Sequence, residues 1–456
     1  MKKLVVVITK SLQEKIDTIN QSGVKKGLLQ SIPFWVASAI TGMVAVLYAK
    51  LFDWAEHTML WLAGLNQWVL FITCPLFFFL SWWTVRKLAP AARGSGIPQV
   101  MAAIELSNPR ENHKVGYLLG MKILITKIIS SILMVLGGGA IGREGPTIQI
   151  AGSVFKWVND LIPATWPKVP RKNMVITGAA AGLAAAFNTP LGGIVFAVEE
   201  LAKNHFKYFR TPLFVAVIIA GLTAQGLLGP YLFLGYPKVT GAVWYIFFPI
   251  IFIAGISGIA GAYLSKIIVR VLHWKKQFKS IKQHLLFLSV AAFLMVIMGT
   301  FVTISALGPG KEVINELLFN DQKDTAWYLP VVRFLGPIIS FTTGGAGGVF
   351  APALSAGASI GGLFASLFQF TDVNANLLIL SGMVGFLTGL TRSPFTSAIL
   401  VLEMTDRHSV IFHLMLAGLL SNLTAWLVDR KSLYDHLKAD YLKETNLNMV
   451  SEKKQT

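Results

Sequence analysis

The sequence predicts an all-α membrane protein that crosses the bilayer many times and is built from two related halves. A low charge content, long apolar runs and an internal repeat lead to this prediction. Of 456 residues, 54% are hydrophobic and only 14% are charged, whereas soluble domains carry about 25% charged residues. So few charges cannot give several soluble domains a hydrated surface, and the composition therefore excludes a soluble enzyme.

The apolar runs supply the expected membrane spans. About 20 apolar residues cross the hydrocarbon layer as a helix, and several stretches of comparable length contain no Asp, Glu, Lys or Arg. These stretches are Leu28–Ala49, Trp61–Val85, Asn173–Val198, Thr211–Pro237, Val239–Ser265, Leu286–Gly310, Phe334–Thr371, Asn374–Thr391 and Ser409–Val428. The run over 334–371 is too long for one upright helix and is rich in Gly, so we expect two segments there, at least one of them broken.

The basic residues predict the orientation of the chain. Forty Lys and Arg outnumber 22 Asp and Glu, and they gather at both termini and at the ends of apolar runs, as in cytoplasmic segments of inner-membrane proteins. Both termini are therefore expected in the cytoplasm, and the positive charge does not indicate a nucleic-acid partner. The short apolar patch Leu4–Ile8 predicts an interfacial amphipathic helix, not a cleaved signal. The single cysteine, Cys74, excludes an internal disulfide and a Cys-based zinc site.

An internal repeat divides the membrane region. Residues Gly178–Pro190 align with Gly382–Pro394 at an offset of 204, and the alignment continues until Glu199 lies over Glu403. Two halves with Gly- and Pro-interrupted segments in matching places are typical of transporters built from structural repeats. We therefore expect an N-terminal segment over 1–27, repeats over 28–235 and 236–428, and a short cytoplasmic tail over 429–456.

Three segments share the spacing Gly-x-x-x-Pro at the edge of an apolar run. Pro is favoured in the first turn of a helix, and Gly before it lets the backbone approach a ligand closely. Each segment therefore predicts a loop that ends in a helix start, whose free N–H groups and positive dipole end favour an anion. One such motif alone would indicate only a turn between helices. The residues are Gly94, Ser95, Gly96, Ile97 and Pro98 in the first motif, Gly142, Arg143, Glu144, Gly145 and Pro146 in the second, and Gly348, Val349, Phe350, Ala351 and Pro352 in the third.

Few charged residues fall inside the apolar part of the chain, and Glu144 is the most informative of them. A carboxylate at the bilayer centre costs about 2.5–3.5 kcal/mol, so such residues usually face a cavity or take part in ion and proton pathways. Glu144 is therefore expected to accept a proton; the alternative is a local ion pair with Arg143. Of Glu199 and Glu200, one is interpreted as a solvated helix end. Lys127 either extends its ammonium to the interface or adds positive potential along an anion route.

Nucleotide- and metal-dependent chemistry has no support in the sequence. Gly137–Gly142 fits the spacing GxGxxG, but it follows a helical apolar segment and not the strand that a dinucleotide site requires. The pair Gly310-Lys311 is followed by Glu312, so it forms no P-loop, and the eight His show no ligand-like cluster. We therefore predict no enzyme activity, no catalytic residues, no cofactor and no metal site.

The three motifs, in this order, resemble the signature of the CLC family of chloride channels and chloride/proton antiporters. The resemblance covers residues 28 to 436 approximately and implies the CLC fold, with two inverted-topology halves and broken helices. It implies a homodimer in the cell inner membrane, surrounded by lipid, with one chloride pathway in each subunit. It also implies that Ser95 and Tyr434 bind chloride through their hydroxyls and that Val349 and Phe350 bind it through their backbone N–H groups.

The resemblance assigns two acidic residues to proton movement. Glu144 matches the external gating glutamate, whose carboxylate occupies an anion position and leaves it when protonated. Glu200 matches the internal proton-transfer glutamate of the antiporters, and Lys127 matches a buried lysine of bacterial members. These matches predict a chloride/proton antiporter; the alternative is a passive voltage- or pH-gated chloride channel of the same family. A third hypothesis is a membrane scaffold without transport, in which the motifs serve only packing.

Overall fold

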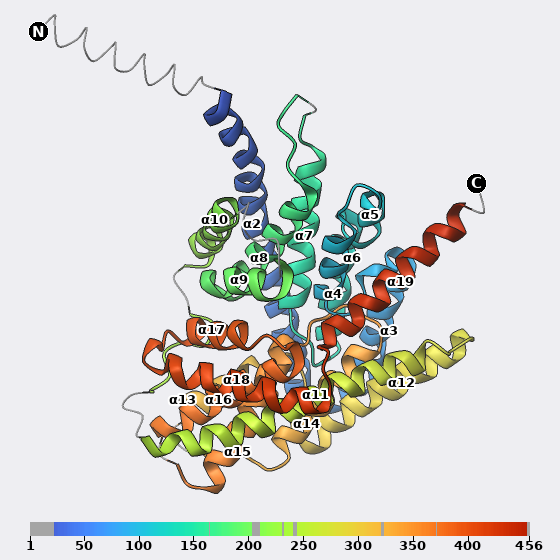
Figure 1. Ribbon diagram of the computed structural model, residues 1–456. Coiled ribbons are helices and arrows are strands. Elements are labelled where there is room, and N and C mark those ends of the chain that lie inside the picture. Colours follow the sequence, from blue (N-terminus) through green and yellow to red (C-terminus); the bar gives the residue numbers. More distant parts are fainter. Residues whose placement is uncertain are drawn as a thin grey trace, which may run out of the picture.

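The computed structural model describes residues 22–163, 165–202, 210–229, 232–239, 244–320, 323–370 and 372–453, and nearly all of them are helical (Figure 1). The all-α prediction is confirmed. The interfacial helix expected near Leu4–Ile8 lies outside the described residues. The helices are α2 (Ser22–Leu65), α3 (Leu70–Leu88), α4 (Ile97–Leu106), α5 (Val115–Leu118), α6 (Met121–Leu136), α7 (Glu144–Asp160), α8 (Arg171–Phe187), α9 (Pro190–Phe196), α10 (Arg210–Leu228), α11 (Phe247–Lys275), α12 (Ile281–Ile297), α13 (Lys311–Phe319), α14 (Leu329–Thr342), α15 (Phe350–Leu367), α16 (Asp372–Thr391), α17 (Pro394–Thr405), α18 (Ile411–Val428) and α19 (Leu433–Lys453).

The described part of the chain contains nine helical segments that are long and apolar enough to cross a membrane. This finding confirms a protein with many spans. One of them, Asn112–Leu136, was not expected, because Lys residues interrupt its sequence. The span expected over Trp61–Val85 is present as Gln67–Leu88, but it begins later than expected. The long helix α2 continues to its end at Leu65, and Asn66 then caps a short turn that separates it from α3.

Proline marks the breaks between helices. The expected break in the run over 334–371 is present, because α14 and α15 are separated by the loop that leads into the third motif. The run over 173–198 is also split. Asn188, with φ of 56°, ends α8, and Pro190 begins α9. Because Pro has no N–H group and clashes with the preceding turn, it cannot continue a helix but suits a new start.

The two inverted halves meet through reciprocal contacts between α9 and α17. Glu199, just beyond α9, accepts a hydrogen bond from the backbone N–H of Thr396 in the first turn of α17, at 2.7 Å. Glu403, near the end of α17, accepts one from the backbone N–H of Gly192 in the first turn of α9, at 2.6 Å. The two carboxylates that align in the internal repeat thus each cap a helix of the other half.

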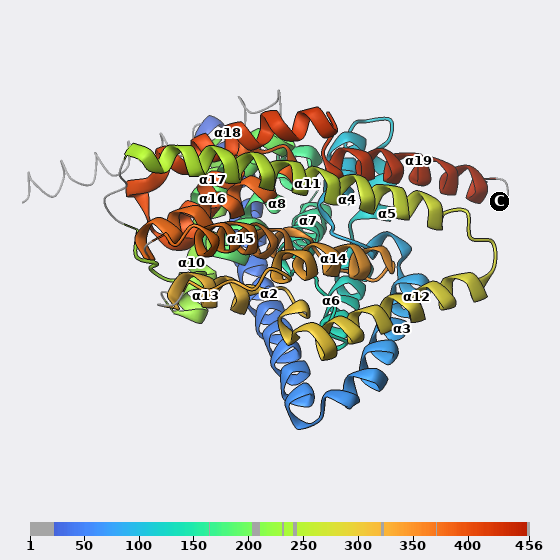
Figure 2. The same cartoon turned by 90° about the horizontal axis from the view of Figure 1, so that it is seen from below.

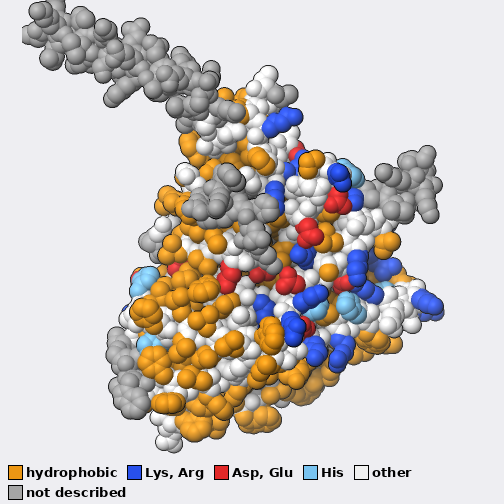
Figure 3. Space-filling model, viewed as in Figure 1, with side chains coloured by type: hydrophobic (Ala, Val, Ile, Leu, Met, Phe, Trp, Pro, Cys, Tyr) orange, Lys and Arg blue, Asp and Glu red, His pale blue; other side chains and the backbone are white. Residues whose placement is uncertain are grey.

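The arrangement of the helices places the motif loops between the halves. In Figure 1, α7 to α10 lie above α13 to α18, and the long helix α2 runs past both groups. The view from below shows α11 and α12 joined by a loop on the right and diverging toward the left, with α14 between them (Figure 2). Hydrophobic side chains cover much of the lower outer surface in Figure 3, as expected for a surface that faces lipid. Lys and Arg side chains gather at the right of the same view.

Candidate functional site

Three helix starts carry the three motifs. α4 begins at Ile97, α7 at Glu144 and α15 at Phe350, and the Pro of each motif stands in the first turn of its helix. The first N–H groups of a helix have no acceptor within it, and this end of the helix carries the positive end of its dipole. The predicted course of the motifs, a loop that ends in a helix start, is therefore confirmed for all three.

Backbone hydrogen bonds join the motif loops directly. Gly94 donates to the carbonyl of Gly345 at 2.8 Å and accepts from the N–H of Gly347 at 3.0 Å. Gly142 and Gly348 donate to each other, at 2.8 and 2.7 Å. The first loop therefore binds the segment just before the third motif, and the second loop binds the third motif itself. Segments that are far apart in the sequence converge on one place.

Two glycines make this close approach possible. Gly96 has φ of +108°, a backbone conformation that L side chains rarely adopt. A Cβ atom at Gly145 would meet both the hydroxyl and the carbonyl oxygen of Ser95. The absence of side chains at these two positions therefore leaves the space beside the Ser95 hydroxyl open.

Two buried hydroxyls face each other beside the motif loops. Ser95 is 1% exposed and Tyr434, in the first turn of α19, is fully buried. Their hydroxyls are close enough to interact, yet neither completes a well-formed hydrogen bond with a described protein group. Phe350 holds the Tyr434 ring by stacking, with the centroids 6.2 Å apart and the planes 9° from parallel. Because buried polar groups are nearly always satisfied, this pair indicates a place for a ligand.

The start of α15 adds backbone donors to the same place. Val349 is the N-cap residue of α15 and Phe350 is its first residue, and both are buried. The contact of Phe350 with Tyr434 puts this helix start beside the two hydroxyls. The structure thus brings together all four residues that the sequence assigned to chloride. Within the described ranges, no three His, Cys, Asp or Glu side chains gather as a metal site would require.

Glu144 lies where the second and third motifs meet, and its side chain is 2% exposed. Its carboxylate interacts with the backbone N–H groups of Glu144 itself and of Ala351, which belong to two different helix starts. Arg143, the alternative partner expected from the sequence, forms its salt bridge with Asp53 at 2.6 Å. The carboxylate therefore occupies backbone donors of the kind that an anion would use.

Glu200 and Glu199 have separate roles in the structure. Glu200 is 7% exposed, and its Oε2 atom accepts a hydrogen bond from the Ser393 hydroxyl at 2.7 Å. Glu199 is bound by the start of α17 and is not merely a solvated helix end, which corrects the interpretation from sequence. The sequence around Glu199 could not reveal this contact, because Thr396, whose N–H group Glu199 caps, lies 197 positions later, in the other half of the chain.

Two buried lysines hold the backbone on either side of the site. Lys127 is fully buried, and its ammonium donates to the carbonyl of Gly94 at 2.8 Å, so of its two alternatives the extension to the interface is excluded. Lys275 donates to the carbonyls of Thr342, at 2.8 Å, and of Thr343, which precede the third motif. Sequence reasoning missed Lys275, because a lysine after an apolar run resembles any solvated helix end.

A cavity of about 640 Å³ leads from the surface beside α19 to Ser95. Trp82 and Phe341 contribute apolar wall, and five Lys or Arg side chains line it against two Asp or Glu. Burial alone would raise the pKa of Asp440 in this wall, but hydrogen bonds and charges from Lys276 and His273 outweigh burial and hold the pKa below its ordinary 3.8. The excess of positive charge favours the entry of an anion.

Comparison with known proteins gives consistent matches over nearly the whole chain. Residues 77–426 match the family described as voltage gated chloride channel. The H(+)/Cl(-) exchange transporter ClcA of Citrobacter koseri is 28% identical over 420 residues, which cover 89% of this chain and 87% of that protein. ClcA of Salmonella typhi is 29% identical over 425 residues, with the same shares of the two chains.

Solved structures share the fold. The structure of a slow cyanobacterial Cl-/H+ antiporter matches with a TM-score of 0.79 at 23% identity, and the match covers 92% of this chain and 99% of that one. A CLC-type fluoride/proton antiporter matches with a TM-score of 0.74 at 18% identity, over 91% of this chain and 99% of that one. The two inverted halves with broken helices are thus a known architecture.

Proposed function

Because this chain belongs to the voltage gated chloride channel family, we propose that it is a secondary transporter that exchanges chloride for protons across the cell inner membrane. The observation that carries the proposal is the place of Glu144. Its carboxylate engages backbone N–H groups from two motif helices at the point where the loops converge. The relatives named H(+)/Cl(-) exchange transporter match over 89% of the chain and support the same activity.

Chloride is held by neutral donors. These are the hydroxyls of Ser95 and Tyr434 and the backbone N–H groups of Val349 and Phe350. Chloride has no shape to recognise, so donors without a full charge suffice, and their moderate strength lets the ion leave again. Lys127 contributes positive potential from behind the first motif loop, where its ammonium is bound to a backbone carbonyl.

Exchange follows from competition between chloride and the Glu144 carboxylate for the same donors. When the carboxylate takes up a proton, it loses its charge and its attraction to the helix starts, and chloride takes its place. When the proton leaves, the carboxylate returns and displaces chloride. Proton binding and chloride binding are then linked reciprocally, as two ligands of one site must be.

Glu200 accepts the proton from the other side. It is buried on the short helical segment after α9, and the Ser393 hydroxyl fixes its orientation. A buried carboxylate within a membrane bundle is typical of proton pathways. Chloride and protons therefore reach the centre by routes that differ in part, since the cavity that ends at Ser95 is not lined by Glu200.

Paired measurement of proton and chloride flux in liposomes tests this function. An imposed chloride gradient should drive protons uphill in the wild type. In Glu144→Gln, proton movement should be lost while chloride still passes, because an amide cannot carry a proton. Glu200→Gln should also lose proton coupling and keep chloride transport. Glu199→Gln is the matched control for the latter, since its side chain caps α17, and coupling should persist.

The same experiment separates the alternatives. Chloride flux without any pH change in the wild type would indicate the passive channel. Absence of both fluxes, together with absence of saturable chloride binding in calorimetry, would indicate the scaffold. Proton flux that persists in Glu144→Gln would remove this residue from the exchange.

We also propose that the protein is a homodimer with both termini in the cytoplasm. The orientation rests on the basic residues at the two ends of the chain. A C-terminal reporter that is active only in the cytoplasm tests it, and an inactive reporter on a stable fusion would contradict it. The dimer is supported by exposed apolar side chains on and beside α9 and α17, among them Leu191 and Phe395.

A further inference from the structure

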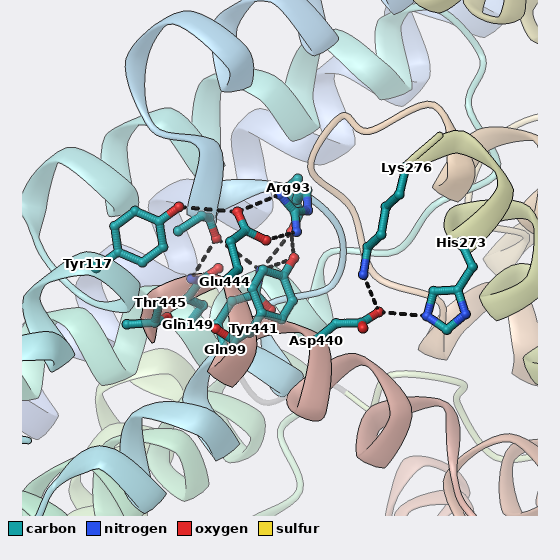
Figure 4. Close-up of polar contacts among 11 residues, drawn as sticks. Arg93, Gln99, Tyr117, Gln149, His273, Lys276, Asp440, Tyr441, Glu444 and Thr445 are labelled. Carbon is teal, nitrogen blue, oxygen red and sulfur yellow. Dashed lines mark hydrogen bonds and ion pairs between the residues drawn. The ribbon is translucent and has the colours of Figure 1, made fainter. Parts of the chain in front are cut away.

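The first motif loop is fastened to α19 at Glu444, ten residues beyond Tyr434. Arg93, which immediately precedes this loop, forms a two-pronged ion pair with Glu444 of α19, with Nη1–Oε1 at 3.1 Å and Nη2–Oε2 at 2.5 Å. The Tyr117 hydroxyl donates to the same carboxylate at 3.2 Å. Figure 4 shows these side chains pointing toward Glu444 from the two sides. Such charge-assisted, bidentate pairs fix geometry as well as adding energy.

Tyr441, one turn earlier on α19, binds the backbone of the same loop. Its hydroxyl donates to the carbonyl of Arg93 at 3.1 Å and accepts a hydrogen bond from Nε2 of Gln99 at 3.0 Å. Gln99 also donates to the Arg93 carbonyl at 2.7 Å, and its Oε1 accepts from the N–H of Gly96 at 3.1 Å. Gln99 therefore holds the loop on both sides of Ser95.

These contacts reach Tyr434 through the helix itself. Tyr434 and Glu444 are ten residues apart on α19, which is about 15 Å along a helix axis. Gln99 is fully buried and Tyr441 is 5% exposed, and the Arg93 guanidinium lies over the Tyr441 ring at 4.9 Å from its centroid. A helix held this firmly at its middle cannot shift its first turn freely. The contacts therefore constrain Tyr434 as well as the loop.

We propose that Arg93, Gln99, Tyr441 and Glu444 set the separation between the Ser95 and Tyr434 hydroxyls and thereby the affinity for chloride. We call these four residues the α19 clamp. They are positioning residues, since they act on the ion only through the loop and the helix. The inference rests on the proposed function, because this separation matters only if the two hydroxyls bind chloride.

The contacts of the clamp favour positioning over general packing. They go to the backbone of the loop that carries Ser95, at Arg93 and Gly96. A second link, also between α4 and α19, does not reach the backbone of this loop through either of its side-chain partners. Lys438 of α19 pairs with Glu105 at the exposed end of α4, at 3.1 Å, so this link goes to a side chain at the far end of α4 from the motif loop. This pair supplies a matched control.

The test compares chloride affinity with thermal stability in detergent-purified full-length protein. Glu444→Gln removes the negative charge of the clamp and keeps Arg93, and Tyr441→Phe removes a single hydroxyl. Both should weaken chloride binding in isothermal titration by about three- to tenfold, or about 0.7–1.4 kcal/mol. Glu105→Gln should leave the chloride Kd unchanged, whatever it does to the melting temperature.

The outcomes are distinct. If the clamp variants lower the melting temperature but keep the wild-type chloride Kd, the clamp is only structural and the proposal is overturned. If Glu444→Gln fails to fold, Tyr441→Phe decides the question by the same comparison. An equal loss of chloride affinity in Glu105→Gln would also overturn the proposal, since any loosening of α19 would then be enough to weaken chloride binding. A wild type that binds no chloride would instead contradict the proposed chloride site.

Discussion

At the scale of single residues, the space beside Ser95 depends on the absence of a side chain at Gly145. A methyl group there would stand where the Ser95 hydroxyl now lies, and it would also meet the Ser95 carbonyl. The carbonyl cannot move far, because the loop is bound by Gly345 and Gly347 on one side and by Gln99 on the other, so the hydroxyl would have to leave its present position. The donor geometry that we propose for chloride is therefore sensitive to a single added methyl group.

Gly145→Ala should lower chloride affinity by at least tenfold, because the added methyl displaces the Ser95 hydroxyl. Gly152→Ala in the same helix is the control, since its Cβ would meet Leu119 and Val100 only at ordinary contact distance, 3.5 Å. Isothermal titration of both variants with chloride is the measurement. Wild-type affinity in Gly145→Ala would show that the hydroxyl does not need its present position.

At the scale of elements, α9 and α17 are short helices that depend on each other for their caps. They have 7 and 12 residues, and an isolated helix of this length is marginal. Glu403 satisfies N–H groups at the start of α9, and Glu199 does the same for α17. The internal repeat in the sequence thus has a direct structural counterpart, because the two aligned glutamates each cap a short helix of the opposite half.

Glu403→Ala should destabilise the protein by about 1 kcal/mol, the usual cost of losing a helix cap. The measurement is the thermal melting of the purified protein in detergent, compared with Glu316→Ala, whose side chain is exposed on α13. Equal melting temperatures for the two variants would mean that the N–H groups of α9 find other partners.

The elements also show which features could be predicted from sequence. The three helix starts were predictable, because Gly and Pro impose their effects on the residues next to them. The ion pair between Arg93 and Glu444 was not, since its partners are separated by 351 positions and nothing local distinguishes them from other charges. The tail expected over 429–456 forms α19, a helix with polar composition that no apolar run could reveal.

At the scale of the whole molecule, one apolar face is suited to a second copy of the chain. Four exposed side chains on and beside α9 and α17 form part of it, namely Leu191, Val198, Phe395 and Phe412, which are 39% to 78% exposed. The capping carboxylates lie just beyond α9 and near the end of α17, and contact with lipid would be costly for them. A protein partner on this face would shield the carboxylates, which supports the proposed homodimer.

The dimer predicts a mass of about twice 49.8 kDa for the protein component in detergent, measured by light scattering. Because Cys74 is buried, an introduced surface cysteine is the main reactive thiol. Phe412→Cys should be joined to its counterpart by a bifunctional maleimide, whereas Phe301→Cys, which is exposed on another element, should not. A monomeric mass would contradict the assembly.

The hydrogen bonds among the motif loops limit how the transporter can move. A rocking cycle, in which one repeat moves as a rigid body against the other, would have to break the backbone hydrogen bonds of Gly94 with Gly345 and of Gly142 with Gly348 at every turnover. With those hydrogen bonds intact, the loops that carry the three motifs keep their relative positions. We therefore expect exchange to proceed through the rotation of single side chains such as Glu144, with the loops as a fixed frame.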